Sequence, residues 1–376
     1  MTLVQIEIQL VAILTASACA LVGVFLILRG MAMMSDAISH AILFGIVLAF
    51  FWIKDISSPL LILAAALTGL LTVSLVEIIH RTKLVREDAA MGLVFPLLFS
   101  IGVILITRYA ENIHLDTDAV LLGELAFAPL NRLFFLGIDL GPKAFFIMAG
   151  IFSLNLFFIL FFYKELKLTT FDSGLAAALG FMPGFIHYAL MSLVSLTAVG
   201  AFDTVGSILV VALMITPPAT AYLITNQLSR MIVGSIIVGV FSAISGYWIA
   251  HWLDVSIAGS MATMTGVIFL SVFLLAPENG LIARTRRRIR LRWDFAQTML
   301  LVHLLHHTGQ PEAPEECHQD HICEHLHWKP EFARQVVRFA KQAGVIRIKQ
   351  NNLTLTPQGQ AQAEQAMLTS ALHPQE

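Results

Sequence analysis

Long apolar segments separated by short polar ones make up the first three quarters of the chain. A helix needs about 20 mostly apolar residues to cross a bilayer. The pattern predicts nine transmembrane helices, or eight if the shortest segment or the closely spaced first pair is broken or re-entrant. The segments are Ile6–Leu28, Met31–Trp52, Pro59–Ile79, Met91–Arg108, Lys143–Tyr163, Phe185–Ala201, Val205–Ile224, Met231–Trp252 and Ile257–Ala276.

Composition supports a polytopic membrane protein and sets the end of the chain apart. Of 376 residues, 57% are hydrophobic and 13% charged, against about 25% charged in a soluble protein. Residues 1–283 carry 11 of the 23 Lys and Arg, while the last 93 residues carry the other 12 and eight of the 13 His. We expect a transmembrane domain at 1–283, a basic juxtamembrane linker at 284–292 and a small cytosolic α+β domain at 293–376.

The charges of the loops predict the orientation, because Lys and Arg collect on the cytoplasmic side of a membrane. Basic residues follow the third and fifth segments, precede the eighth at Arg230, and form a run of six arginines after the ninth. The intervening loops are acidic or neutral. This alternation places the N-terminus outside and the C-terminus in the cytosol, with the arginine run against anionic lipid. The segment 121–135 in the long fourth loop reads as a short amphipathic or interfacial segment.

One predicted transmembrane helix contains two ionisable residues, Asp36 and His40. Their spacing of four places both side chains on one helix face, about one turn apart. Ionisable groups at membrane depth are costly and mostly line a pathway or pair with something. The pair is therefore half of a candidate divalent-metal site. The alternative is structural, with His40 bonded to a neighbouring helix and Asp36 in an interface.

Two later stretches suggest moving parts. In Phe171–Leu190, Asp172 or Ser173 can cap a short helix through Ala176 to Leu179, which Gly180 can end. A short capped helix in a cytoplasmic loop is typical of an element that docks onto a partner protein. An ordinary amphipathic connector would have the same sequence pattern. The following Val205–Ile224 segment combines small residues with Pro217 and Pro218, which favours close packing and a broken helix.

The tail from Trp293 has the element order of a winged helix-turn-helix: three helices, two short strands joined near Asn351, and a closing helix. Its cysteines and histidines provide a second metal hypothesis, at Cys317, His318, His321 and Cys323, but the spacing matches no standard zinc pattern. Packing against a partner protein is the simpler role for this domain, and nucleic-acid binding is the less favoured one.

Three motifs in order resemble the integral-membrane permeases of the zinc, manganese and iron ABC importers, the ABC-3 type. SDAISHAILFGIVLAF resembles the second-helix signature of that family, FDSGLAAALG its coupling segment, and VGSILVVALMITPPATA a later helix. The resemblance covers about residues 5–280, and the tail resembles an extension of some members. One departure is Leu43, Phe44 and Gly45, where the family usually has leucine, proline and glycine; the missing proline bears on the metal geometry and not on the identity of the ligands.

The resemblance implies a bacterial inner-membrane permease with a second identical or related permease, two cytoplasmic ATPase subunits and a periplasmic or surface metal-binding protein. It also implies that Asp36 and His40 line the metal path. The segment that docks into the ATPase would then contain Phe171, Asp172, Ala176, Ala177 and Gly180.

We therefore predict a transport subunit that is not an enzyme and that holds no permanent cofactor, with manganese, iron or zinc as the transported ion. The chain has no G-x-x-x-x-G-K phosphate loop, so ATP hydrolysis requires another polypeptide. The alternatives are a secondary metal transporter or channel without an ATPase, and a membrane-anchored metal-responsive regulator.

Overall fold

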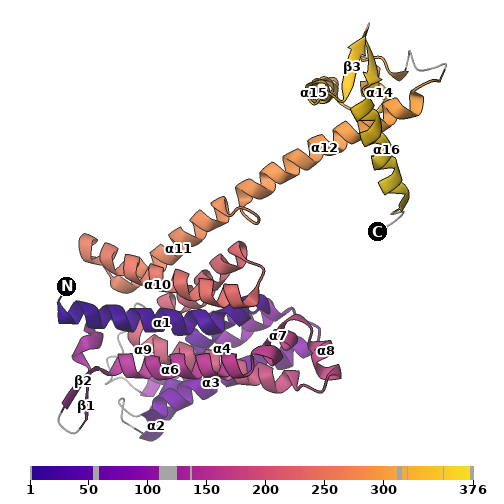
Figure 1. The fold of residues 1–376 in the computed structure, drawn as a ribbon. Coiled ribbons are helices and arrows are strands. Elements are labelled where there is room, and N and C mark those ends of the chain that lie inside the picture. The colour runs from indigo at the N-terminus through magenta and orange to yellow at the C-terminus, as the bar shows by residue number, and fades with distance from the viewer. Residues whose placement is uncertain are drawn as a thin grey trace. The chain divides into compact units, whose positions relative to one another are not determined.

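The structure is a computed structural model that describes residues 2–53, 59–109, 125–135, 138–310, 316–319, 321–349 and 351–372. It divides into two compact units, Met1–Gly280 and Leu281–Glu376, drawn from indigo to salmon and from orange to yellow (Figure 1). The first unit contains the predicted membrane segments. The predicted linker 284–292 lies inside the first helix of the second unit, Leu281–His307.

The first unit is a bundle of long helices (Figure 1). In the described residues, eight helices are long and apolar enough to cross a membrane. These eight are α1 (Leu3–Leu28), α2 (Met33–Ile53), α3 (Pro59–Arg81), α4 (Glu87–Tyr109), α6 (Lys143–Phe161), α9 (Pro183–Ile224), α10 (Leu228–Leu253) and α11 (Ile257–Leu275). Two short helices, α7 (Tyr163–Phe171) and α8 (Ser173–Ala178), lie between α6 and α9.

Helix α9 joins two of the predicted spans. Its 42 residues would measure about 63 Å if straight, twice the roughly 30 Å of a bilayer's hydrocarbon core. Gly206 interrupts it with non-helical angles, φ 77° and ψ 165°. This positive φ is one that glycine adopts without strain.

Contacts with α1 show that the chain turns back within α9. The amide of Asn155 lies between the Ala18 carbonyl oxygen and the Thr197 hydroxyl, at 3.4 and 2.8 Å. A Cβ atom added to Gly23 would lie 2.0 Å from the carbonyl oxygen of Met214. Moving from Thr197 to Met214 thus leads towards the C-terminal end of α1. The two halves of α9 are antiparallel, so the eight helices of the described residues pass through the bundle nine times.

Helix α1 is the centre of the bundle. Every residue from Thr15 to Leu26 is buried, and α6, α9 and α10 pack around it. A helix that is buried on all sides in this way contains small residues that allow its neighbours to approach closely. Ala16 and Gly23 are two such positions, since Ala16 contacts Gly239 of α10 and Gly23 contacts Met214 of α9.

Gly23→Ala is expected to destabilise the bundle. The new methyl group would lie 2.0 Å from a main-chain oxygen, so α1 and α9 would have to separate, at about 1–3 kcal/mol. Thermal unfolding of the purified chain in detergent measures the effect as a lower midpoint. The control is Gly150→Ala in α6, where an added Cβ meets nothing within 4 Å. Equal midpoints for the two variants would contradict the close approach.

The loop between α4 and α6 differs from the expected amphipathic segment. Residues 121–124 lie outside the described residues, and the rest forms a 3-10 helix, η1 (Leu125–Leu130), and a hairpin of β1 (Arg132–Phe135) and β2 (Ile138–Pro142). Pro129 prevents an α-helix here because it lacks an N–H donor. The guanidinium of Arg132 forms ion pairs with Glu7 of α1 at 3.1 Å and with Asp139 at 2.5 Å, which fixes the hairpin against α1.

The second unit follows the predicted order of helices and strands. Its elements are α12 (Leu281–His307), α14 (Ile322–His325), α15 (Pro330–Gln342), β3 (Ile346–Lys349), β4 (Asn352–Leu355) and α16 (Pro357–Leu372). Strands β3 and β4 are antiparallel, with Ile346 opposite Leu355. Helix α15 buries Ala333, Val336, Val337 and Ala340, the spacing of an amphipathic helix on a core.

Candidate functional site

The start of α2 positions the acidic residue of the candidate site. Gly30, with φ +73°, makes the turn between α1 and α2, and Asp36 lies in the first turn of α2. A carboxylate is stabilised there by the positive end of the helix dipole. The helix continues from Met33 to Ile53 through Leu43–Gly45, the place where the sequence departs from the family pattern.

Asp36 and His40 face each other. The His40 Nε2 atom lies 3.4 Å from an Asp36 carboxylate oxygen, and each side chain is 30% exposed. The imidazole ring lies 5.8 Å from the Phe95 ring and 5.9 Å from the Phe99 ring of α4, measured between centroids. The pair is thus held on one side by aromatic rings and open on the other. His40 is about 10 Å along α2 from its first residue, on the cytoplasmic half of this helix in the predicted orientation.

A pocket of about 190 Å³, lined by both apolar and ionisable side chains, lies beside the start of α2. Sequence spacing did not reveal it because His187 of α9 is far along the chain from the ionisable residues of α3 and α4 that it meets. Glu77 of α3 also accepts a hydrogen bond from the Tyr188 hydroxyl of α9 and pairs with Arg81 at 2.6 Å. The pocket is lined by Met31, Met34, Val73, Val76, Glu77, His80, Glu87 and His187.

Arg29, at the end of α1, connects this region to the predicted coupling segment. Its guanidinium donates to the hydroxyls of Thr169 and Thr170 at the end of α7, both at 3.2 Å, and lies 3.3 Å from Nδ1 of His187. Burial lowers the pKa of Arg29 to about 10, so it remains protonated at neutral pH. A charged group thus holds α1, α7 and α9 together directly before α8.

The predicted short helix is present as α8. The Asp172 side chain caps it by accepting from the Leu175 N–H at 2.8 Å. Gly180 ends it with φ +86°, and the Phe181 N–H donates to the Ala176 carbonyl at 3.0 Å. Ala176 is fully buried and therefore positions the helix from within, while Ala177 is exposed.

An apolar surface surrounds α8, and we call it the α8 patch. It consists of Phe171, Leu175, Leu179 and Met182, which are 64%, 48%, 61% and 73% exposed. Exposed apolar side chains gathered in a loop region make a candidate interaction site. The family resemblance pointed to Phe171 but not to the other three, and a six-residue helix has too little periodicity to reveal them.

In the described part of the tail, one group of side chains could hold a metal ion, and it contains none of the four residues that the sequence suggested, Cys317, His318, His321 and Cys323. Cys317 is buried, and burial raises the pKa of its thiol. His321 is exposed on the surface. The candidate group contains His303 and His307 of α12 and Glu316, whose ligand atoms lie within 4.8 Å of one another.

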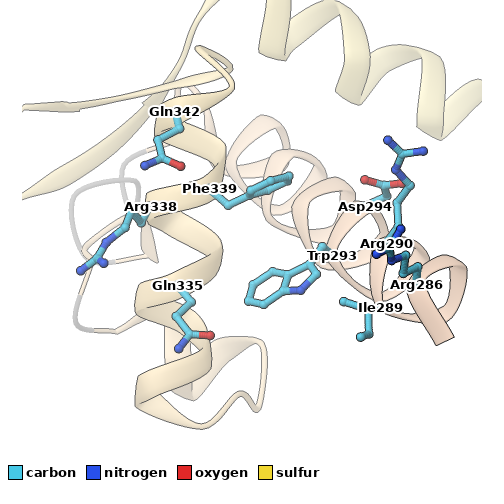
Figure 2. A pocket seen from close by; sticks show the side chains of 9 residues that line it. All are labelled: Arg286, Ile289, Arg290, Trp293, Asp294, Gln335, Arg338, Phe339 and Gln342. Atoms are coloured by element: carbon cyan, nitrogen blue, oxygen red, sulfur yellow. The ribbon is translucent and has the colours of Figure 1, made fainter. Parts of the chain in front are cut away.

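A separate pocket of about 600 Å³ lies between α12 and α15 in the second unit. Figure 2 shows Trp293 and Phe339 between the two helices, with Arg286 and Arg290 on α12 and Arg338 on α15. Asp294 is the acidic residue in this lining. The lining of this pocket is mainly basic and aromatic, which does not suit a cation. The pocket contains no residue of the Asp36 and His40 pair or of the group of His303, His307 and Glu316.

Comparison with known proteins shows which family the chain belongs to. The ABC 3 transport family matches residues 4–276. The chain belongs to the ABC 3 transport family. It is the multi-pass permease subunit of an ATP-driven metal importer in the cytoplasmic membrane. It is not an enzyme, and ATP is hydrolysed on a separate chain.

Two relatives of this permease are similar over most of their length. The zinc transport system membrane protein TroD of Treponema pallidum (strain Nichols) is 45% identical over 358 residues, 95% of this chain and 97% of the relative. The manganese transport system membrane protein MntD of Bacillus subtilis (strain 168) is 47% identical over 284 residues, 76% of this chain and 96% of the relative. The first alignment is longer than the first unit, so it reaches into the second.

A solved structure has the same fold as the first unit. PsaBC from Streptococcus pneumoniae, in complex with Fab, aligns with a TM-score of 0.62 and 32% identity, covering 74% of this chain and 94% of that chain.

Proposed function

We propose that Asp36 and His40 are ligands along the path of the imported metal ion, and that this ion is manganese, zinc or iron. The proposal rests on the arrangement of these two side chains: His40 Nε2 lies 3.4 Å from an Asp36 carboxylate oxygen, and each side chain is 30% exposed. A carboxylate next to an imidazole suits all three ions. Exposing such a pair to lipid is costly, so we infer that its open side faces the path.

A second permease, identical or related, would complete the site. One chain offers one carboxylate and one imidazole, fewer ligands than a transition metal takes. Two copies that meet across the open side of α2 would bring four ligands to one axis. Such a shared site can release its ion when the two subunits move apart, which alternating access requires.

The α8 patch is where we place the ATPase. Its leucines and Phe171 provide an apolar surface in the predicted cytoplasmic loop, and Arg29 links the preceding α7 to α1 and α9. Closure of two ATPase subunits on α8 would thus act on α9, which packs against α2, and on α1, which leads into α2. A periplasmic or surface metal-binding protein would deliver the ion from outside, and the second unit would lie in the cytosol.

Reconstitution tests the proposal against a secondary transporter. We expect proteoliposomes that contain the permease, its ATPase and its binding protein to accumulate manganese, zinc or iron only when ATP is present on the ATPase side. The control is the same complex with an ATPase variant that binds but does not hydrolyse ATP. Uptake driven by a proton or sodium gradient, without ATPase, would overturn the proposal.

A further inference from the structure

Two histidines and a glutamate come together in the second unit. His303 and His307 are four residues apart on α12, and their ring centroids lie 4.7 Å apart. Glu316 is next to them in space, and the ligand atoms of all three residues lie within 4.8 Å of one another. Ligands of a tetrahedral zinc ion lie about 3.3 Å apart, given Zn–N distances of about 2.0–2.1 Å. Small side-chain rotations would therefore close the group around an ion.

The hydrogen bonds of the two imidazoles leave nitrogen atoms available for a metal. The Nε2 atom of His303 lies 3.1 Å from the main-chain oxygen of Glu316. Donation to a main-chain carbonyl is a common second-shell contact of metal-bound histidine, and it leaves Nδ1 with a lone pair. Nδ1 of His307 is buried and has no hydrogen-bond partner within the described part of the chain. A buried polar atom without a partner is costly, and a metal ion would supply one.

His325 of α14 offers a fourth ligand. Its Nδ1 atom lies 3.1 Å from a carboxylate oxygen of Glu316, and its ring is stacked on that of His303 with centroids 5.9 Å apart. Both imidazoles can turn towards the same point because each already contacts Glu316. The four residues come from α12, α14 and the segment between them.

We propose that the second unit binds a zinc-class divalent cation through His303, His307, Glu316 and His325. Three imidazoles and one carboxylate form a four-coordinate set that suits zinc, and the same set would bind manganese more weakly. The ion would fasten the end of α12 to Glu316 and α14. This site is separate from Asp36 and His40, and its existence does not depend on the direction or energy source of transport.

Zinc binding to the full-length chain in detergent tests the proposal. The protein carries Asp36→Ala and His40→Ala, so that the transport pair does not contribute, and zinc is titrated against a chromophoric chelator. We expect one tight zinc equivalent per chain. His307→Gln and Glu316→Gln should each weaken it by about 100-fold, since loss of even an outer-shell partner costs about 10–100-fold. The matched control, His306→Gln, removes an exposed neighbouring imidazole and should leave the affinity unchanged.

Cobalt substitution and the cysteines provide a second readout. Cobalt bound by imidazole and carboxylate should show weak visible bands without a thiolate charge-transfer band. Far-UV circular dichroism of zinc-free His307→Gln and Glu316→Gln checks that the second unit remains folded. If only one of these two variants is folded, its zinc affinity decides between the outcomes. Absence of a tight equivalent, unchanged affinity in the folded variant, or loss of binding in Cys317→Ser or Cys323→Ser alone would overturn the proposal.

Discussion

Asp36→Ala is expected to abolish metal uptake by the assembled transporter while leaving the complex intact. The substitution removes the single carboxylate of the facing pair, and it leaves His40 open to the path without its partner at 3.4 Å. In a shared site it removes two of four ligands at once. Uptake should fall by about 100-fold or more, since changes to outer-shell partners alone cost about 10–100-fold in metal affinity. Uptake of labelled manganese, zinc and iron into proteoliposomes measures the effect.

Two further variants separate a ligand role from a packing role. His40→Gln keeps much of the volume beside Phe95 and Phe99 but changes the donor, and it should also lose uptake. Ser39→Ala is the matched control, because Ser39 is buried in the same helix and its hydroxyl donates to the Ser35 carbonyl at 2.8 Å. Normal uptake in both Asp36→Ala and His40→Gln would show that the ion crosses on other groups.

Features set by short sequence spacings could be predicted from the sequence. Asp36 and His40 meet because a helix places residues four apart on one face. The helix after Asp172 forms because this aspartate cap and Gly180, which ends the helix, lie eight residues apart in one segment. The membrane helices themselves follow from the length of the apolar segments.

Features made by distant segments could not be predicted in this way. The pocket beside α2 requires Glu77, Glu87 and His187 to be brought together by the packing of three helices. In the tail, Cys317 turns inward because its main-chain carbonyl accepts from the N–H of Leu353 on β4, at 2.9 Å. That strand pairing moves Glu316, and not the thiol, next to the histidines of α12. Spacing alone carries no information about such a contact.

Leu175→Asp in the α8 patch is expected to uncouple the permease from its ATPase. The leucine side chain is 48% exposed and would be covered in the complex, where an unpaired carboxylate is costly to bury. Central apolar contacts of an interface contribute about 2 kcal/mol or more, so the affinity for the ATPase should fall by about 30-fold or more. Co-purification of the ATPase and ATP-driven uptake should both be lost. Helix α8 itself should remain, because Asp172 caps it and Ala176 anchors it from its buried side.

Leu130→Asp is the matched control for this substitution. Leu130 is a 76% exposed leucine in η1, in a loop that the predicted orientation places on the opposite face of the membrane, so ATPase retention should be unchanged. Leu179→Asp, on the same patch as Leu175, should reproduce the loss. If the ATPase stays bound in both patch variants, α8 is a connector and the force on α2 must enter through another cytoplasmic loop. If it is lost in the Leu130→Asp control as well, the added charge acts through general instability, which the thermal unfolding midpoint of each variant detects directly.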